Sequence, residues 1–156
     1  MKRAIAAAAL ALVMGATSHP VFAGEFDRPV KARKALMQVY VFNIGILGAM
    51  AKGKTPYDAK IAQAAADNLL AAVSMKNPTM WPKGSGNDAL GDKTRAKPEI
   101  WSTYPKVAEK SKAMKSAAAK MASVAGSGLD AVKANMKQLG KGCGGCHKPF
   151  RAPKPK

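Results

Sequence analysis

The fold of this chain is decided by residues 129–150, which read LDAVKANMKQLGKGCGGCHKPF. Side chains suited to a core recur there at intervals of three and four residues: Leu129, Val132, Met136, Leu139, Cys143, Cys146, His147 and Phe150. That spacing places all of them on one face of an α-helix. The pattern therefore predicts a long amphipathic helix whose buried face carries two cysteines and a histidine.

The five residues Cys143-Gly144-Gly145-Cys146-His147 form a C-x-x-C-H motif, which is the attachment signature of c-type haem. The two thiols are spaced to add to the two vinyl groups of one haem, and the adjacent imidazole is suited to be the proximal iron ligand. The motif thus predicts one covalent haem c, held by Cys143 and Cys146, with His147 on the iron.

Three other interpretations of the cysteine pair remain open. A zinc site needs four protein ligands, or three and a water, yet residues 24–156 contain only two cysteines and one histidine, with no acidic residue close by in sequence. A thioredoxin-like redox pair is expected at the start of a helix, whereas this motif closes one. A simple disulfide is the third alternative.

The N-terminal residues resemble a cleaved secretory signal peptide. Lys2 and Arg3 form a positive start, residues 4–16 are apolar, and Val21-Phe22-Ala23 resembles a cleavage site. The alternative is an uncleaved anchor, but 13 apolar residues fall short of the roughly 20 that span a bilayer. We therefore expect a signal peptide over 1–23, one domain over 24–156, no later membrane-crossing segment, and a periplasmic location in a bacterium.

The exported part of the chain is strongly basic. Without Lys2 and Arg3 it keeps 24 basic and 9 acidic side chains. Such a charge attracts an acidic redox partner protein, anionic lipid or nucleic acid. Nucleic-acid binding is the weakest of the three, because the basic residues are not interleaved with aromatic ones and no finger or RNP-like motif is present.

Three further helices precede the haem motif. Residues 29–52 place larger apolar side chains at helical spacing up to Gly53: Met37, Tyr40, Val41, Ile44 and Leu47. Thr55-Pro56-Tyr57-Asp58 then resembles a helix start, and the inner positions of a second helix are Ile61, Ala65, Leu69, Ala72 and Met75. A third helix, capped by Ser102 or Thr103, carries Trp101, Tyr104, Val107, Met114, Ala118 and Met121 inward.

Residues 77–97 are rich in Pro, Gly, Asp and Lys and predict a long loop, whose Met80-Trp81 pair is expected to fold back onto the core. Residues 126–128 break the chain again before the last helix. Four amphipathic helices joined mainly by short turns predict an all-α protein, an antiparallel four-helix bundle that encloses its cofactor. We expect Tyr57 and Trp101 to be anchors of the core or loops rather than redox groups.

With these motifs in order, the chain resembles the cytochrome c-prime family, the class II c-type cytochromes. Four segments carry the resemblance: Arg33-Lys34-Ala35-Leu36-Met37, residues 53–58, Lys97-Pro98-Glu99-Ile100-Trp101, and the C-x-x-C-H-x-x-aromatic-Arg ending at residues 143–151. One departure is Pro149, which lacks an N–H and is expected to kink or end the last helix at the haem. Residues 151–156 are expected to fray.

The resemblance implies roles for residues of the first helix. Low-spin members place a methionine sulfur on the distal side of the iron, and Met37 stands at that position, four residues after Arg33. Leu36 is the fallback wall residue if the helix is rotated by one position. Since His19 leaves with the signal peptide, two histidine ligands from one chain are excluded. Arg33 is expected beside a haem propionate, and Arg151 beside the proximal face.

These expectations combine into a periplasmic, monohaem, low-spin electron carrier with His147 and Met37 as axial ligands. No catalytic acid, base or nucleophile is expected, so the chain is not predicted to be an enzyme. One alternative is a five-coordinate, high-spin protein that binds NO or CO. Another is an interaction protein that docks through its charge and keeps its haem for structure. A homodimer through the first helix, as in some relatives, stays an open expectation.

Overall fold

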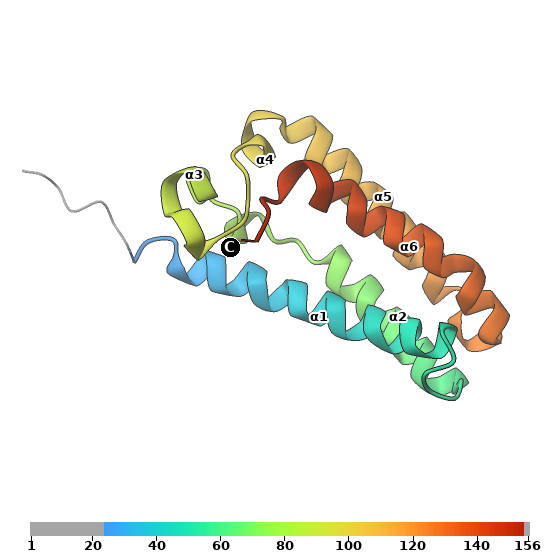
Figure 1. The fold of residues 1–156 in the computed structure, drawn as a ribbon. Helices are drawn as coiled ribbons and strands as arrows, with labels where there is room; N and C mark the ends of the chain where they lie inside the picture. Colours follow the sequence, from blue (N-terminus) through green and yellow to red (C-terminus); the bar gives the residue numbers. More distant parts are fainter. Residues whose placement is uncertain (1–23, 155–156) are drawn as a thin grey trace, which may run out of the picture.

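The described part of the computed structural model, residues 24–154, is a bundle of four long helices. The predicted signal peptide, residues 1–23, lies outside these residues. The bundle helices are α1 (Asp27–Ala51), α2 (Ala59–Ser74), α5 (Tyr104–Ala122) and α6 (Leu129–Phe150). Each runs antiparallel to the next along the chain, and α6 returns beside α1 (Figure 1). The predicted antiparallel four-helix bundle is confirmed.

Short elements connect the long helices. The segment between α2 and α5 contains η1 (Pro78–Met80), α3 (Asn87–Leu90), η2 (Gly91–Lys93) and α4 (Glu99–Ser102), so the predicted loop is partly helical. A last turn, η3 (Ala125–Ser127), precedes α6. All elements of the α2–α5 connection gather at the end of the bundle where α1 begins and α6 finishes (Figure 1). That end also holds the C-x-x-C-H motif.

The turn between α1 and α2 follows from local sequence chemistry. Gly53 adopts a φ of 67°, a conformation that favours glycine, and ends α1 as predicted. The second helix begins later than expected, because its N-cap is Asp58, whose side chain accepts a hydrogen bond from Ile61 N at 2.9 Å. Tyr57 anchors this turn by donating its hydroxyl to the carbonyl of Ala125 at 2.8 Å.

The core is built largely from small residues, which lets the helices approach closely. Alanines at 62, 65, 66, 117, 118 and 125 are buried around Leu47, Leu69, Met121, Val132 and Leu139. The predicted inward stripe of α6 is confirmed. Four predicted core residues are instead exposed: Val41, Ile61, Met75 and Tyr104. The predicted side-chain cap of the third helix is also wrong, because Thr103 Oγ1 donates to Glu99 O instead.

The outer face of α1 is apolar and exposed. Val41 and Phe42 keep 63% and 68% of their surface accessible, and Val39 is also exposed. Val41 and Phe42, together with Ile46 and Ile61, border a groove of about 740 Å³ between α1 and the turn that follows it. By length and composition α1 is even apolar enough to span a membrane, which corrects the expectation that nothing after the signal peptide would be. Here it packs along α2 and α6.

Candidate functional site

The three residues of the haem motif project from one face of α6. Cys143, Cys146 and His147 are all half-buried, and both thiols are free. Burial raises the pKa of both thiols. Burial, together with the charges of Arg151 and Arg95, lowers the pKa of His147, which favours the neutral imidazole that binds metals. In the described residues no group of three or more His, Cys, Asp and Glu side chains is placed to hold a metal ion.

The first helix, α1, supplies the candidate residues for the other side of the haem site. Tyr40 is half-buried on α1, its hydroxyl donates to Ala72 O at 3.2 Å, and burial and then the proximity of Cys146 raise its pKa. Tyr40 and Cys143 pack against the same core cluster, so this side of α1 lies toward the bundle interior that α6 also lines. Met37 lies three residues before Tyr40, on the same side of the helix, and is half-buried. Leu36 is already covered by the protein, with 6% of its surface exposed.

Arg33 is more deeply buried than expected, with 3% of its surface exposed. Its guanidinium donates to Ser85 Oγ at 2.7 Å, to Ser85 O at 2.6 Å, to Thr94 Oγ1 at 2.8 Å and to Met80 O at 3.3 Å. It also lies 4.8 Å from the ring centroid of Trp81. Arg33 thus fastens α1 to the α2–α5 connection, one turn before Met37.

The charge of Arg33 has no carboxylate partner within 4 Å in residues 24–154. Burial accordingly lowers its pKa. A buried cation surrounded only by neutral acceptors is costly unless an anion compensates it. A haem propionate is an anion of the right chemistry for a guanidinium. This charge without a carboxylate partner, carried one turn before Met37 on α1, fits a haem propionate in this region.

The C-terminal segment is paired, not frayed, through Ala152. Ala96 and Arg151 form an antiparallel bridge, Lys97 N donates to Phe150 O at 3.0 Å, and Ala152 N donates to Arg95 O at 2.8 Å. Pro149 lies inside the last turn of α6, which ends one residue later at Phe150, so the helix includes the whole motif and ends just after it. These bonds place Arg95 beside His147, a neighbour that the sequence reading missed because it lies 52 residues away.

Apolar side chains flank the motif on two sides. The main core reaches Cys143, and a second cluster of Ala96, Ile100 and Phe150, covered by Trp81 and Trp101, lies beyond the end of α6. The Trp81 carbonyl accepts from Trp101 Nε1 at 3.0 Å, which confirms that this part of the loop folds back. Two apolar clusters on either side of Cys143, Cys146 and His147 suit a flat, largely apolar cofactor.

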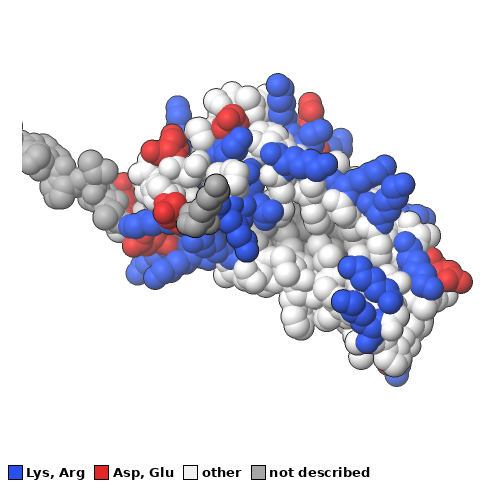
Figure 2. Space-filling view, viewed as in Figure 1, with Lys and Arg blue, Asp and Glu red and all other residues white. Residues whose placement is uncertain are grey.

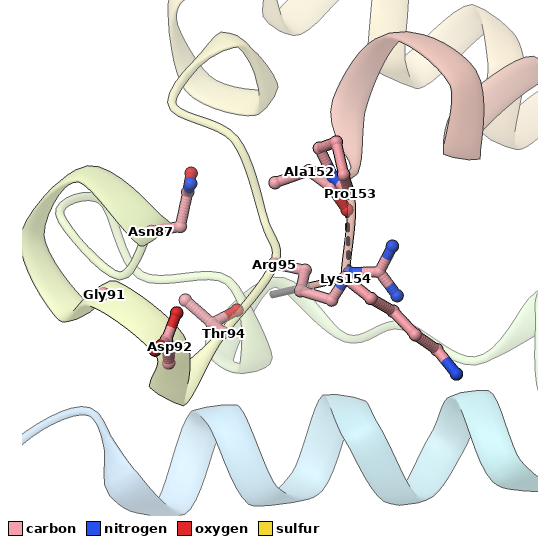
Figure 3. A pocket seen from close by; sticks show the side chains of 8 residues that line it. All are labelled: Asn87, Gly91, Asp92, Thr94, Arg95, Ala152, Pro153 and Lys154. Carbon is pink, nitrogen blue, oxygen red and sulfur yellow. Dashed lines mark hydrogen bonds between the residues drawn. The ribbon is translucent and has the colours of Figure 1, made fainter. Parts of the chain in front are cut away.

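A small polar pocket lies between η2 and the C-terminal segment (Figure 3). Its lining includes Asn87, Asp92, Thr94, Arg95 and Lys154, and its volume is about 240 Å³. That is below the roughly 300–1,000 Å³ of most small-molecule sites. Arg95 Nε donates to the Ala152 carbonyl at 2.7 Å across the pocket, so its main effect is to hold the two segments together.

Comparison with known proteins settles the family. A family model described as Cytochrome C' matches residues 28–151, nearly the whole described chain. The chain is a member of the cytochrome c' family. Members bind one covalent haem c, and this cytochrome carries the two cysteines required for it.

The relatives of this cytochrome include proteins named cytochrome c-554 and proteins named cytochrome c'. It is 41% identical to cytochrome c-554 of Cereibacter sphaeroides over 83% of its own length and 96% of that protein. The solved cytochrome c' described as from Rhodobacter Spheriodes superposes with a TM-score of 0.80 at 31% identity, over 83% of this chain and 99% of that one. Both support the four-helix fold and a role as a haem-binding electron-transfer protein.

Two further solved relatives have titles that mention ligands or assembly. One is a cytochrome c' with "ligand-controlled dimer dissociation", 27% identical with a TM-score of 0.75 over 82% of this chain and 97% of that one. The other is a variant of the Alcaligenes xylosoxidans protein with bound NO, 25% identical with a TM-score of 0.72 over 84% and 98%. Homologues therefore form dimers in some structures.

Proposed function

We propose that this cytochrome is a low-spin, one-electron carrier in which Cys143 and Cys146 hold the haem by thioethers. His147 is the proximal iron ligand and Met37 the distal ligand. The observation that carries the proposal is the position of Met37 on α1: it is half-buried, and it lies one turn from Tyr40, which packs against the same core cluster as Cys143. When bound, the haem supplies the one-electron chemistry, and His/Met ligation favours a raised potential.

The neighbours of Met37 take supporting roles in this proposal. Arg33 compensates a haem propionate with its buried charge while it keeps the α2–α5 connection in place. Leu36 packs beside the methionine and excludes water. Arg151 lies one turn after His147, where its charge adds to the effect of burial in lowering the pKa of the imidazole. Both axial ligands come from long helices, which limits rearrangement when the electron arrives or leaves.

The test is the optical spectrum of the holoprotein, oxidised and reduced, with and without carbon monoxide. We expect sharp low-spin bands, a methionine-to-iron charge-transfer band in the oxidised form, and no carbon monoxide uptake. Met37→Ala should lose the charge-transfer band and gain carbon monoxide binding. Met136→Ala is the matched control, because it removes another half-buried methionine, which lies beside Gly48 and seven residues before Cys143. A high-spin wild type that takes up carbon monoxide would refute ligation by Met37.

A second candidate function is five-coordinate binding of NO or CO. The comparisons favour it over the low-spin carrier, because the family description and the solved relatives carry the name cytochrome c' and one of those relatives has bound NO. In that case Met37 would line the open sixth position of the iron without binding to it. The same spectra separate the two functions, since only the five-coordinate protein binds carbon monoxide without mutation.

Export to the periplasm and cleavage after Ala23 also belong to this proposal. Covalent haem attachment through a C-x-x-C-H motif and the signal-like residues 1–23 support them. The measurement is the intact mass of the protein recovered from the bacterial periplasm. We expect the mass of residues 24–156 plus one haem, and a retained N-terminus would contradict cleavage.

We further propose that the exposed apolar face of α1 pairs two copies of this chain. Phe42 and Val41 border the 740 Å³ groove, and homologues form dimers in some structures. Phe42→Glu should shift sedimentation from dimer to monomer without changing the haem spectrum. A wild type that is monomeric at all concentrations would refute the pairing.

A further inference from the structure

Four basic side chains surround the haem motif, and we name them the motif-edge cluster: Arg95, Lys110, Lys148 and Arg151. A Cβ placed on Gly145 would lie 3.6 Å from Lys110 Cδ, and one on Gly144 would lie 3.8 Å from Lys148 Cε. The Ala96–Arg151 bridge and the bonds of Arg95 to Ala152 bring the other two to the same end of α6. The cluster therefore borders Cys146 and His147.

The cluster is open to interaction. Lys110, Lys148 and Arg151 are exposed and Arg95 is half-exposed. The ion pairs found within residues 24–154 join Lys93 to Asp27, Lys97 to Glu99 and Lys133 to Asp130, so none of them neutralises the cluster. Four uncompensated cations around one edge create a concentrated positive field.

Charge is distributed unequally over the bundle. The helices α5 and α6 carry nine lysines and two acidic residues, and Figure 2 shows basic side chains spread along them. By contrast, α1 has no charged residue from Gln38 to Ala51. The basic face and the apolar groove of α1 are thus different surfaces, suited to different partners.

From this arrangement we infer that the motif-edge cluster is the docking surface for an acidic redox protein. A docked partner exchanges one electron with the haem: the iron changes between Fe(III) and Fe(II), the partner's redox centre changes by one electron in the opposite direction, and no bond forms or breaks. The inference rests on the proposed electron-carrier function. It adds the chemistry of the partner and the edge through which the electron passes.

A protein surface fits this cluster better than a membrane does. Binding at a lipid surface combines basic side chains with apolar ones that insert among the headgroups. Most exposed large apolar side chains of residues 24–154 lie on α1 or α2 or at the end of α2: Val39, Val41, Phe42, Ile61 and Met75. Only Tyr104, the first residue of α5, lies on a helix that carries part of the cluster. Complementary charge alone is enough to steer a protein partner to its site.

The test compares two doubly charge-reversed variants of the holoprotein. Lys110→Glu with Lys148→Glu changes the cluster, whereas Lys120→Glu with Lys137→Glu makes the same change in net charge elsewhere on α5 and α6. At 1.5 Å per residue, Lys120 lies about 15 Å along α5 from Lys110. That is beyond the screening length of about 8 Å at 0.15 M salt. The probes are hexacyanoferrate, an anionic redox complex, and tris(phenanthroline)cobalt, a cationic one.

We expect the cluster variant to lose about tenfold in its rate with hexacyanoferrate at low salt and to react faster with the cobalt complex. The control variant should change by less than about twofold, and added salt should remove the difference. Equal losses in both variants would overturn the inference, because net charge alone would explain them. Loss of binding to phosphatidylglycerol vesicles in the cluster variant, without a rate change, would overturn it in favour of a membrane. Spectra of each variant show separately whether the proposed iron ligation holds.

Discussion

Replacing Gly142 by alanine tests how closely α5 approaches α6 just before the haem motif. A Cβ at this position would lie 2.8 Å from Met114 Sδ and 3.2 Å from Met114 Cα. The sulfur sits near the end of a flexible side chain and is able to move, but the Cα belongs to α5 itself. Relief of the second contact therefore requires the two helices to separate.

The magnitude follows from two opposing terms. Alanine is favoured over glycine inside a helix by about 1 kcal/mol. Overfilling a packed contact typically costs about 1–3 kcal/mol. We therefore expect Gly142→Ala to lower the free energy of unfolding of the holoprotein by about 1 kcal/mol, despite its better helix propensity.

A matched control lies one half-turn away on the same helix. A Cβ on Gly140 would meet nothing within 4 Å, so Gly140→Ala should raise the free energy of unfolding by about 1 kcal/mol. The difference between the variants in urea unfolding isolates the contact with Met114 and should be about 1–3 kcal/mol. Equal stabilisation by both substitutions would refute the close approach.

Three further predictions concern the connections between helices. Arg33→Met should lower the free energy of unfolding by about 2–4 kcal/mol in urea titrations, because the buried carbonyl of Ser85 loses a charged donor; a change below 1 kcal/mol would contradict the clamp. Asp58→Ala should cost about 1 kcal/mol through loss of the N-cap, and Asp58→Asn much less; equal costs would argue against capping. Tyr57→Phe should lower thermal stability by about 1 kcal/mol because the carbonyl of Ala125 loses its donor, and an unchanged melting curve would refute that bond.

The helices and the attachment motif were predictable because they depend on local spacing. The stripe from Leu129 to Phe150 holds a constant phase over six turns, so its buried face is unambiguous. The outer side of α1 misled the prediction for a physical reason. Val41 is apolar and three residues before Ile44, which fits helical spacing, but α1 is apolar around most of its circumference, so composition alone does not distinguish the core from the groove.

The surroundings of the site depended on contacts that are distant in sequence. Arginine is rarely buried without an acidic partner, so nothing near Arg33 in the sequence indicated that Ser85 and Thr94 would surround it. The pairing of Ala96 with Arg151 likewise joins segments 55 residues apart. One signal was available for Arg95. It lies two residues before Lys97-Pro98-Glu99, the segment that resembles the family at the approach to the third helix.

The α2–α5 connection touches both helices that carry the proposed axial ligands. It holds α1 through Arg33 and holds the end of α6 through Ala96 and Lys97. The distance between α1 and the end of α6 therefore depends on the length of the α2–α5 connection. It does not depend only on how the side chains of the two helices pack against each other. In the proposed electron carrier, such a brace would make the two helices move as a unit when the electron arrives or leaves. Insertions or deletions in the α2–α5 connection would therefore change the spacing between α1 and α6 at the proposed iron site without replacing any ligand.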